Sequence, residues 1–186
     1  LVICDMPFGS YQVSEEEGLR NAIRIMKETG ADAVKIEGGA EIAPMIKRMV
    51  DAGIPVSGHL GLTPQSVHKF GGYGLRAKDE AEAEKLMADA KALDEAGCFC
   101  IVLEKVPAAL AQKVTESVSC ATIGIGAGNC CDGQVLVYAD MLGMNPSFRP
   151  KFVRKYADMY NVMTSAIAQY VNDVKSTDFP NETESY

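Results

Sequence analysis

The sequence has neither a long hydrophobic run nor a cluster of basic residues. Its apolar runs fall far short of the roughly 20 residues that a membrane-spanning helix needs, so we expect no membrane partner. The 18 Lys and Arg residues are scattered, and the formal net charge is −7 at pH 7. Nucleic-acid-binding proteins and polybasic membrane-binding segments concentrate positive charge instead. We therefore expect no nucleic-acid partner either.

Cysteine and histidine motifs that build metal or redox centres are also absent. None of the six cysteines forms a C-x-x-C pair, and four of them lie in apolar stretches where cysteine acts as a small hydrophobic residue. The two histidines, His59 and His68, have no His or Cys at the spacing of a zinc site. We expect neither a disulfide framework nor a zinc centre.

Short apolar segments alternate with amphipathic helical segments along the chain. Hydrophobic residues make up 47% of the sequence and charged residues 23%, which is ordinary for a globular protein. The apolar segments predict strands at residues 1–4, 33–36, 55–58, 99–103, 121–125 and 135–138. One or two helices over 150–174 and a polar tail over about 175–186 follow. This alternation predicts an α/β fold with a parallel sheet, in a single domain over 1–186.

Four successive predicted strands end in polar side chains of the kind that active sites use. Asp5, Glu37, His59 and Glu104 follow the first four strands in order. In a (β/α)8 barrel the carboxyl ends of all strands form one ring around the active site. A doubly wound sheet would gather functional residues at a single switch point instead. The pattern favours the barrel, with the doubly wound sheet as the alternative.

The side chains of this ring suit chemistry on an oxo acid. Asp5 and Glu37 offer hard oxygen ligands for Mg²⁺. Lys35 projects to the same face of an extended strand as Glu37 and can hold a carboxylate or oppose a developing enolate. Glu104 follows an apolar run and is a candidate general base. His59 is a candidate binding residue of the same ring.

Each of these residues also has a purely structural interpretation. A single acid at a strand end can cap the following loop or pair with a neighbouring lysine. A lone histidine in an apolar setting is more often a hydrogen-bonded packing residue than a catalyst. The functional interpretation therefore depends on the residues occurring together on successive strands.

Several stretches together resemble the ketopantoate hydroxymethyltransferase family. The most specific is Gly58-His59-Leu60-Gly61-Leu62-Thr63-Pro64-Gln65-Ser66. The others, in matching order and spacing, are Asp5–Phe8, Val34–Gly39, Phe70–Tyr73, Val102–Glu104, Ile123–Asn129, Asp132–Gln134 and Pro150–Phe152. The resemblance covers essentially the whole chain.

The resemblance implies a Mg²⁺-dependent (β/α)8 TIM barrel of the phosphoenolpyruvate-mutase type, with about six of the eight strands in this chain. It implies transfer of a hydroxymethyl group from 5,10-methylenetetrahydrofolate to 3-methyl-2-oxobutanoate through a Mg²⁺-stabilised enolate. The product, 2-dehydropantoate, leads to pantothenate and coenzyme A. The resemblance also implies a large homo-oligomer, such as a decamer, in the cytoplasm, or in the mitochondrion of a eukaryote.

The family pattern also implies a role for each candidate residue. Asp5 resembles a metal ligand that touches substrate, and Glu37 a second metal ligand. Lys35 and His59 resemble substrate-binding residues, and Glu104 resembles the general base. No stretch of the sequence indicates where the folate binds.

One departure from the family pattern concerns the start of the chain. The family begins with two further βα units that carry a Gly-Asp-Ser signature with another metal ligand, and this sequence has no Gly-Asp-Ser. We therefore expect the amino-terminal part to be missing, and this polypeptide alone to lack one metal ligand and an intact barrel, which would lower its activity. Two other readings stay open, namely a related Mg²⁺-dependent lyase or mutase on 2-oxo acids and a non-catalytic barrel fragment.

Overall fold

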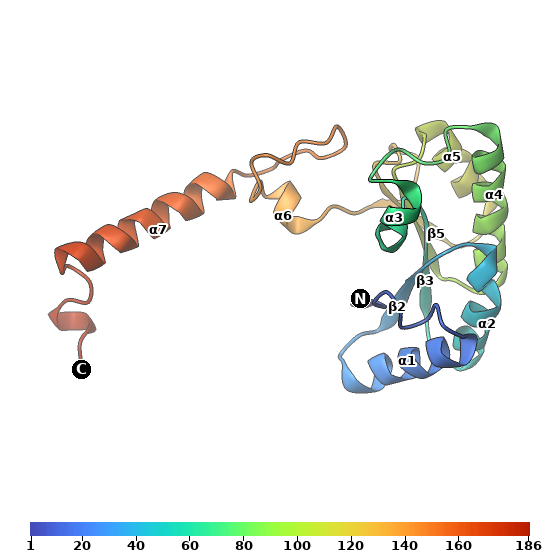
Figure 1. Cartoon of the computed structure of the whole chain (residues 1–186), viewed down its shortest axis with the longest axis horizontal. Coiled ribbons are helices and arrows are strands. Elements are labelled where there is room, and N and C mark those ends of the chain that lie inside the picture. Colours follow the sequence, from blue (N-terminus) through green and yellow to red (C-terminus); the bar gives the residue numbers. More distant parts are fainter. The chain divides into compact units, whose positions relative to one another are not determined.

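A computed structural model describes all 186 residues of the chain. The chain divides into two compact units, Leu1–Val135 and Leu136–Tyr186, each of which is described by itself (Figure 1). The first unit contains the parallel sheet and every candidate site residue. The organisation of 1–186 as one domain stays a prediction.

Six parallel strands of the first unit lie side by side in the order in which they occur in the chain. They are β1 (Ile3–Asp5), β2 (Ala33–Glu37), β3 (Val56–Gly61), β4 (Cys100–Glu104), β5 (Ala121–Ile125) and β6 (Gly133–Gln134). A doubly wound sheet reverses its strand order at the switch point, whereas a barrel keeps sequential order. The sheet is therefore part of a TIM barrel, as the sequence predicts.

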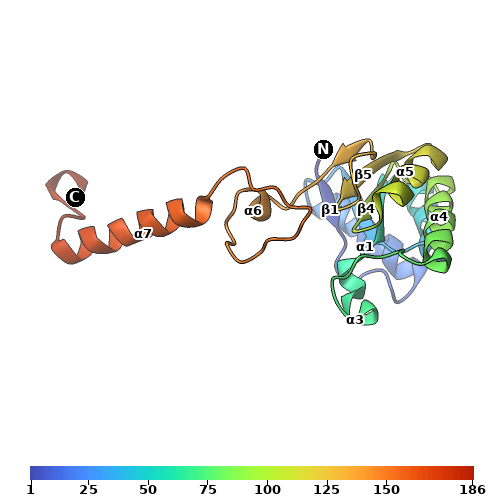
Figure 2. The same cartoon turned by 90° about the horizontal axis from the view of Figure 1, so that it is seen from above.

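Helices connect these strands and lie along the outside of the curved sheet, as Figure 2 shows for α4 and α5. They are α1 (Glu15–Glu28), η1 (Ala40–Ile42), α2 (Ala43–Asp51), η2 (Pro64–Ser66), α3 (Val67–Phe70), α4 (Glu80–Glu95) and α5 (Ala108–Ser117). The start of α1 illustrates why they form where they do. The Ser14 side chain accepts a hydrogen bond from the Glu17 backbone at 3.1 Å, and three acids in the first turn favour the positive end of the helix dipole.

Two strand predictions need correction. The third strand was expected at 55–58, but β3 continues to Gly61, so His59 lies within the strand and pairs with strands on both sides. The sixth was expected at 135–138, but β6 covers only Gly133–Gln134. Val135 still donates to the Gly124 carbonyl at 3.0 Å. Its side chain is nevertheless 44% exposed, so the apolar run has no buried surface to hold it as a strand.

The two faces of the sheet differ in chemistry because successive side chains of a strand point to opposite sides. The helix-covered face is apolar and fully buried at Val34, Ile36, Val56, Ile101 and Leu103. These residues belong to the hydrophobic core that α2 and α4 complete with Ile46, Met49 and Leu93. The opposite, inner face carries the polar side chains.

One glycine allows the helix layer to approach the sheet closely. Gly58 lies on the helix-covered face of β3, and a Cβ atom there would be 2.8 Å from Cδ1 of the buried Leu93 on α4. A side chain at this position would displace the Leu93 side chain from its place in the core. Gly58 thus allows α4 to pack closely on the helix-covered face of β3, while the His59 side chain lies on the inner face of the sheet.

The second unit contains α6 (Tyr138–Met141), α7 (Met159–Ser176) and η3 (Glu182–Glu184). The helix prediction over 150–174 is confirmed only from Met159 onward, and part of the predicted polar tail is helical. None of the α7 residues is buried within this unit. No helix of the structure has the length and apolar character needed to cross a membrane.

Candidate functional site

Five predicted site residues meet on the inner face of the sheet, at the carboxyl ends of β1 to β4. The register pairs Asp5 with Lys35 and Glu37 with His59, and it pairs Gly61 with Glu104. Parallel strands in this register bring their last residues to one edge. The sequence prediction that these side chains lie together is confirmed.

Lys35 lies between the two carboxylates that were predicted as metal ligands. Its Nζ is 2.6 Å from Asp5 Oδ2 and 4.0 Å from Glu37 Oε1. The Glu37 side chain is 4% exposed and that of Asp5 is 53% exposed. The ammonium of Lys35 therefore lies near two carboxylates, one buried and one half exposed.

His59 links this group to Glu104. Its Nε2 is 3.3 Å from Glu104 Oε2, and its Nδ1 is 3.7 Å from Glu37 Oε1 and 3.3 Å from Lys35 Nζ. The His59 side chain is 4% exposed and that of Glu104 is 16% exposed. Although Nε2 and Glu104 are close enough for an ion pair, Nε2 makes no aligned hydrogen bond. Nε2 therefore faces Glu104 as an ion-pair partner and not through an aligned hydrogen bond.

The charges around His59 decide its protonation. Burial alone would lower the pKa of His59, but the Glu104 and Glu37 carboxylates outweigh burial and raise that pKa above its ordinary value. Lys35 opposes them, since its positive charge, 3.3 Å from Nδ1, repels the charge of an imidazolium. The net effect favours an imidazolium between two carboxylates.

Tyr11 and Gln65 hold Glu37 in place, and sequence reasoning missed both roles. The Gln65 backbone donates to Glu37 Oε2 at 2.9 Å, and the Glu37 backbone donates to the Tyr11 hydroxyl at 3.0 Å. That hydroxyl donates in turn to Gln65 Oε1 at 2.8 Å. Burial raises the pKa of Tyr11 to about 12, so the phenol stays protonated. Gln65 fixes one oxygen of Glu37, which leaves Oε1 towards Lys35 and His59.

The Gln65 side chain also ties together two loops that are distant in the sequence. Its Nε2 donates to the Met6 carbonyl at 2.8 Å, and its Oε1 accepts from Gln12 Nε2 at 3.0 Å. The loop after β1 is thereby fastened to the loop after β3. Gln65 belongs to the most specific stretch of the sequence, and that membership could have identified it as a site residue. Nothing in the sequence singled out Tyr11.

The donor set is compatible with a magnesium ion that keeps most of its water. No group of three or more His, Cys, Asp or Glu side chains is arranged to hold a metal. Asp5 and Glu37 are two hard carboxylate donors on neighbouring strands that already converge on a cation. Mg²⁺ is commonly bound by one or two carboxylates, with water and substrate oxygens completing the octahedron. The residues present fit such an ion.

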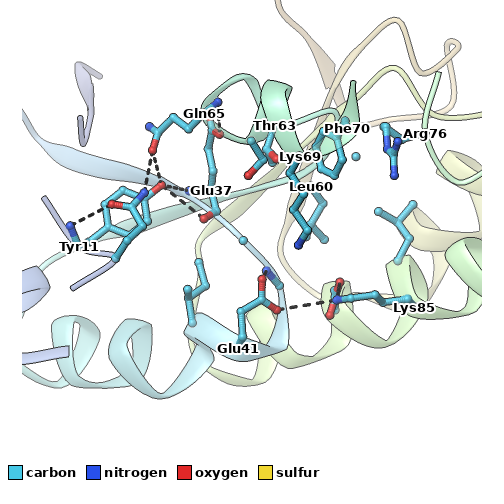
Figure 3. A pocket seen from close by; sticks show the side chains of 18 of the residues that line it. Tyr11, Glu37, Glu41, Leu60, Thr63, Gln65, Lys69, Phe70, Arg76 and Lys85 are labelled. Carbon is cyan, nitrogen blue, oxygen red and sulfur yellow. Dashed lines mark hydrogen bonds and ion pairs between the residues drawn. The ribbon is translucent and has the colours of Figure 1, made fainter. Parts of the chain in front are cut away.

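A cavity of about 660 Å³ lies next to Glu37, beyond the carboxyl ends of β2 and β3 (Figure 3). Glu41 and Lys85 line it on the side of α2 and α4, and Lys69, Phe70 and Arg76 line it on the other. Asp5, Lys35, His59 and Glu104 do not line it. Glu37 is therefore the residue shared by the cavity and the inner-face site.

Sequence reasoning did not single out the charged residues of this cavity. Lys85 Nζ is 2.5 Å from Asp89 Oδ2 and 3.8 Å from Glu41 Oε2. Arg76 pairs with Glu82, and its guanidinium carbon lies 4.0 Å from the centre of the Phe70 ring. The helical spacing of Lys85 and Asp89 was visible in the sequence, but that pattern alone does not distinguish a cavity wall from a solvated helix face.

Comparison with known proteins gives a consistent answer over the whole chain. Residues 1–182 match the family model described as ketopantoate hydroxymethyltransferase. The chain is 63% identical over 186 residues to the 3-methyl-2-oxobutanoate hydroxymethyltransferase of Bacteroides thetaiotaomicron, covering all of this chain and 68% of that protein. It is 64% identical to the enzyme of that name from Bacteroides fragilis and 62% identical to that from Flavobacterium johnsoniae, with the same coverage.

Proposed function

Since the chain belongs to the ketopantoate hydroxymethyltransferase family, we propose that it transfers a hydroxymethyl group from 5,10-methylenetetrahydrofolate to 3-methyl-2-oxobutanoate. The product is 2-dehydropantoate, a precursor of pantothenate and coenzyme A. The observation that carries the proposal is the convergence of Lys35, Glu37 and Glu104 around His59 on the inner face of the sheet.

Asp5 and Glu37 would hold the magnesium ion of this reaction. The bound ion supplies Lewis-acid polarisation of the keto oxygen of the oxo acid. Gln65 occupies the other oxygen of Glu37 and so keeps Oε1 directed into the site. Asp5, at the exposed mouth, can rearrange its contact with Lys35 when a ligand enters.

Lys35 provides a fixed positive charge at the centre of the site. Its side chain is 19% exposed, and its Nζ lies 2.6 Å from Asp5 Oδ2 and 4.0 Å from Glu37 Oε1. An ammonium in this position attracts the carboxylate of the oxo acid and stabilises negative charge that develops on the enolate oxygen. Lys35 therefore binds and orients the substrate.

Glu104 acts as the general base. The C3–H bond of the oxo acid breaks, the proton passes to the carboxylate, and the electron pair forms the enolate double bond between C2 and C3. C3 then forms a bond to the methylene carbon of the folate as the bond of that carbon to N10 breaks. Water replaces N5 at the same carbon and supplies the hydroxyl group. Tetrahydrofolate leaves with the proton from Glu104 and the second proton of the water on its two nitrogens. His59, whose Nε2 is 3.3 Å from Glu104 Oε2, keeps this carboxylate directed towards the interior and binds substrate beside it.

The proposal is tested by following both substrates by NMR in D2O with the purified protein and Mg²⁺. We expect the C3 proton of the oxo acid to exchange with solvent and 2-dehydropantoate to form only when the folate is added. Cleavage of the oxo acid without any need for folate would instead support a lyase or mutase. If neither exchange nor turnover is observed, the result contradicts an enzymatic role and supports a non-catalytic fragment.

We also propose that the protein forms a large homo-oligomer in the cytoplasm. The exposed apolar side chains of α7 support self-association, because an isolated apolar helix face is normally covered. All six cysteines are free, which is compatible with a reducing compartment.

A further inference from the structure

We propose that the cavity next to Glu37 is the binding site of the folate co-substrate, and that Lys69 contacts the glutamate carboxylate of that ligand. The inference rests on the proposed function for the identity of the ligand. Its structural basis, a site for a flat aromatic carboxylate, comes from the charges, the walls and the position of the cavity.

The charges of the cavity leave one cation without a partner. Each acid of the lining has its own donor. Glu15 pairs with Arg48, Glu82 with Arg76, and Asp89 with Lys85. Glu37 accepts from the Gln65 backbone, and Glu41 accepts from the Gly39 backbone. Arg76 and Lys85 are thereby paired. Lys69 lines the cavity but makes no direct hydrogen bond or ion pair.

The environment of Glu41 shows that the Lys69 charge acts within the cavity. The pKa of Glu41 is lowered, although burial alone would raise it, because backbone donors, Lys85 and then Lys69 stabilise its carboxylate. Lys69 thus remains an unpaired positive charge at the edge of a partly apolar space. A carboxylate of a ligand is the group that would complete this pairing.

The walls of the cavity suit a flat ring system. Apolar and aromatic side chains from several segments line it, among them Tyr11, Ile42, Met45, Leu60, Phe70 and Leu86. Small-molecule sites are mostly apolar with a few placed polar groups, and they span about 300–1,000 Å³. At about 660 Å³, the cavity is large enough for a bicyclic ring with an aromatic extension.

The position of the cavity brings its ligand to the proposed reaction centre. Glu37 contributes to the cavity wall and also lies 4.0 Å from Lys35 Nζ and 3.7 Å from His59 Nδ1. A folate bound here with its glutamate towards Lys69 has its ring end free to approach the strand ends. The two substrates would then meet at the edge that Glu37 occupies.

The test measures binding of 5-formyltetrahydrofolate, a stable reduced folate, to the purified protein by calorimetry. We expect Lys69→Gln to weaken this binding about tenfold, as the loss of a charge-assisted contact does. The matched control is Lys113→Gln, an exposed helical lysine outside the cavity, which should bind as the unaltered protein does. The probe that lacks the glutamate, 5-formyltetrahydropteroate, should bind the unaltered protein and Lys69→Gln equally.

Three results would overturn the inference in distinguishable ways. If Lys69→Gln binds 5-formyltetrahydrofolate with unchanged affinity while turnover is retained, the folate binds elsewhere and the proposed function stands. If the unaltered protein binds 3-methyl-2-oxobutanoate but neither folate probe, the inference and the hydroxymethyl transfer both fail. Equal loss of affinity for both probes in Lys69→Gln would contradict the contact with glutamate.

Discussion

At the scale of single residues, the Tyr11 hydroxyl holds the backbone of the deepest acid in the site. It accepts from the Glu37 backbone at 3.0 Å and donates to Gln65 Oε1 at 2.8 Å, and Tyr11 is 3% exposed. A buried backbone N–H without a partner costs about 1–3 kcal/mol. The hydroxyl therefore contributes to stability as well as to the orientation of Glu37.

Tyr11→Phe removes this hydroxyl while keeping the ring that packs in the core. We expect the free energy of unfolding to fall by about 1–3 kcal/mol, because the Glu37 N–H is left without an acceptor. Tyr73→Phe is the control, since that tyrosine is 65% exposed, and it should change stability by less than about 0.5 kcal/mol. Urea unfolding measures both, and equal stability of the two variants would contradict the role of Tyr11.

The candidate residues were predictable because they follow strands that the hydrophobic pattern marks. Asp5, Glu37 and Glu104 each end an apolar run, and parallel pairing alone then brings them together. The Tyr11 contact was not predictable, since it depends on a loop that folds back over 26 residues of sequence. Lys69 was missed for the same reason, because only the tertiary fold creates its cavity.

At the scale of elements, Asp94 connects the end of α4 to the segment that enters β5. Its carboxylate accepts from Ser119 N at 2.8 Å, from Ser119 Oγ at 2.9 Å and from Cys120 N at 2.9 Å. Burial alone would raise the pKa of Asp94, but these donors lower it below its ordinary value. The charged carboxylate therefore stabilises the folded state.

Asp94→Asn tests this connection and its pH dependence. We expect a loss of about 1 kcal/mol at pH 7, since the carboxylate is partly exposed and the amide keeps some of the acceptor capacity. The folded pKa lies below the unfolded value of about 3.9, so the stabilisation is complete above that value and is lost as the pH falls through the folded pKa. Thermal unfolding from pH 7 downward should show the difference from the unaltered protein shrinking below about pH 4. A difference that grows on acidification, or the same loss in the exposed control Glu95→Gln, would contradict the assignment.

Helix caps and apolar runs in the sequence predicted most boundaries of the helices and strands. The two wrong strand predictions have a physical cause. Ser14 starts α1 through a cap that the sequence displays. The extension of β3 to Gly61 was missed because its burial depends on pairing with β2 and β4, which a local pattern does not contain. The apolar run at 135–138 failed as a strand because the fold leaves Val135 and Val137 half exposed.

At the scale of the whole molecule, α7 presents apolar side chains that the second unit does not cover. Tyr160, Met163, Ile167, Tyr170 and Val174 recur at helical spacing and are 41–60% exposed. The proposed homo-oligomer would cover this face. Light scattering coupled to size-exclusion chromatography should then give a multiple of the 20.0 kDa chain mass.

Ile167→Asp places a charge in the middle of this face and should shift the protein towards a 20.0 kDa species. Ser165→Asp, on another side of α7 and also exposed, should leave the mass unchanged. Light scattering of the two variants at equal concentration separates these outcomes. An unaltered mass for Ile167→Asp would show that α7 does not hold the assembly together.

The proposed transfer depends on one step, the removal of the C3 proton of the oxo acid by Glu104. The most direct measurement is the rate at which the C3 proton of 3-methyl-2-oxobutanoate exchanges for deuterium in the Glu104→Gln variant, with Mg²⁺ present and no folate. We expect exchange to fall by at least about 100-fold, with Mg²⁺ binding retained, whereas Glu84→Gln, an exposed glutamate on α4, exchanges normally. Exchange at the normal rate in Glu104→Gln would show that Glu104 is not the base.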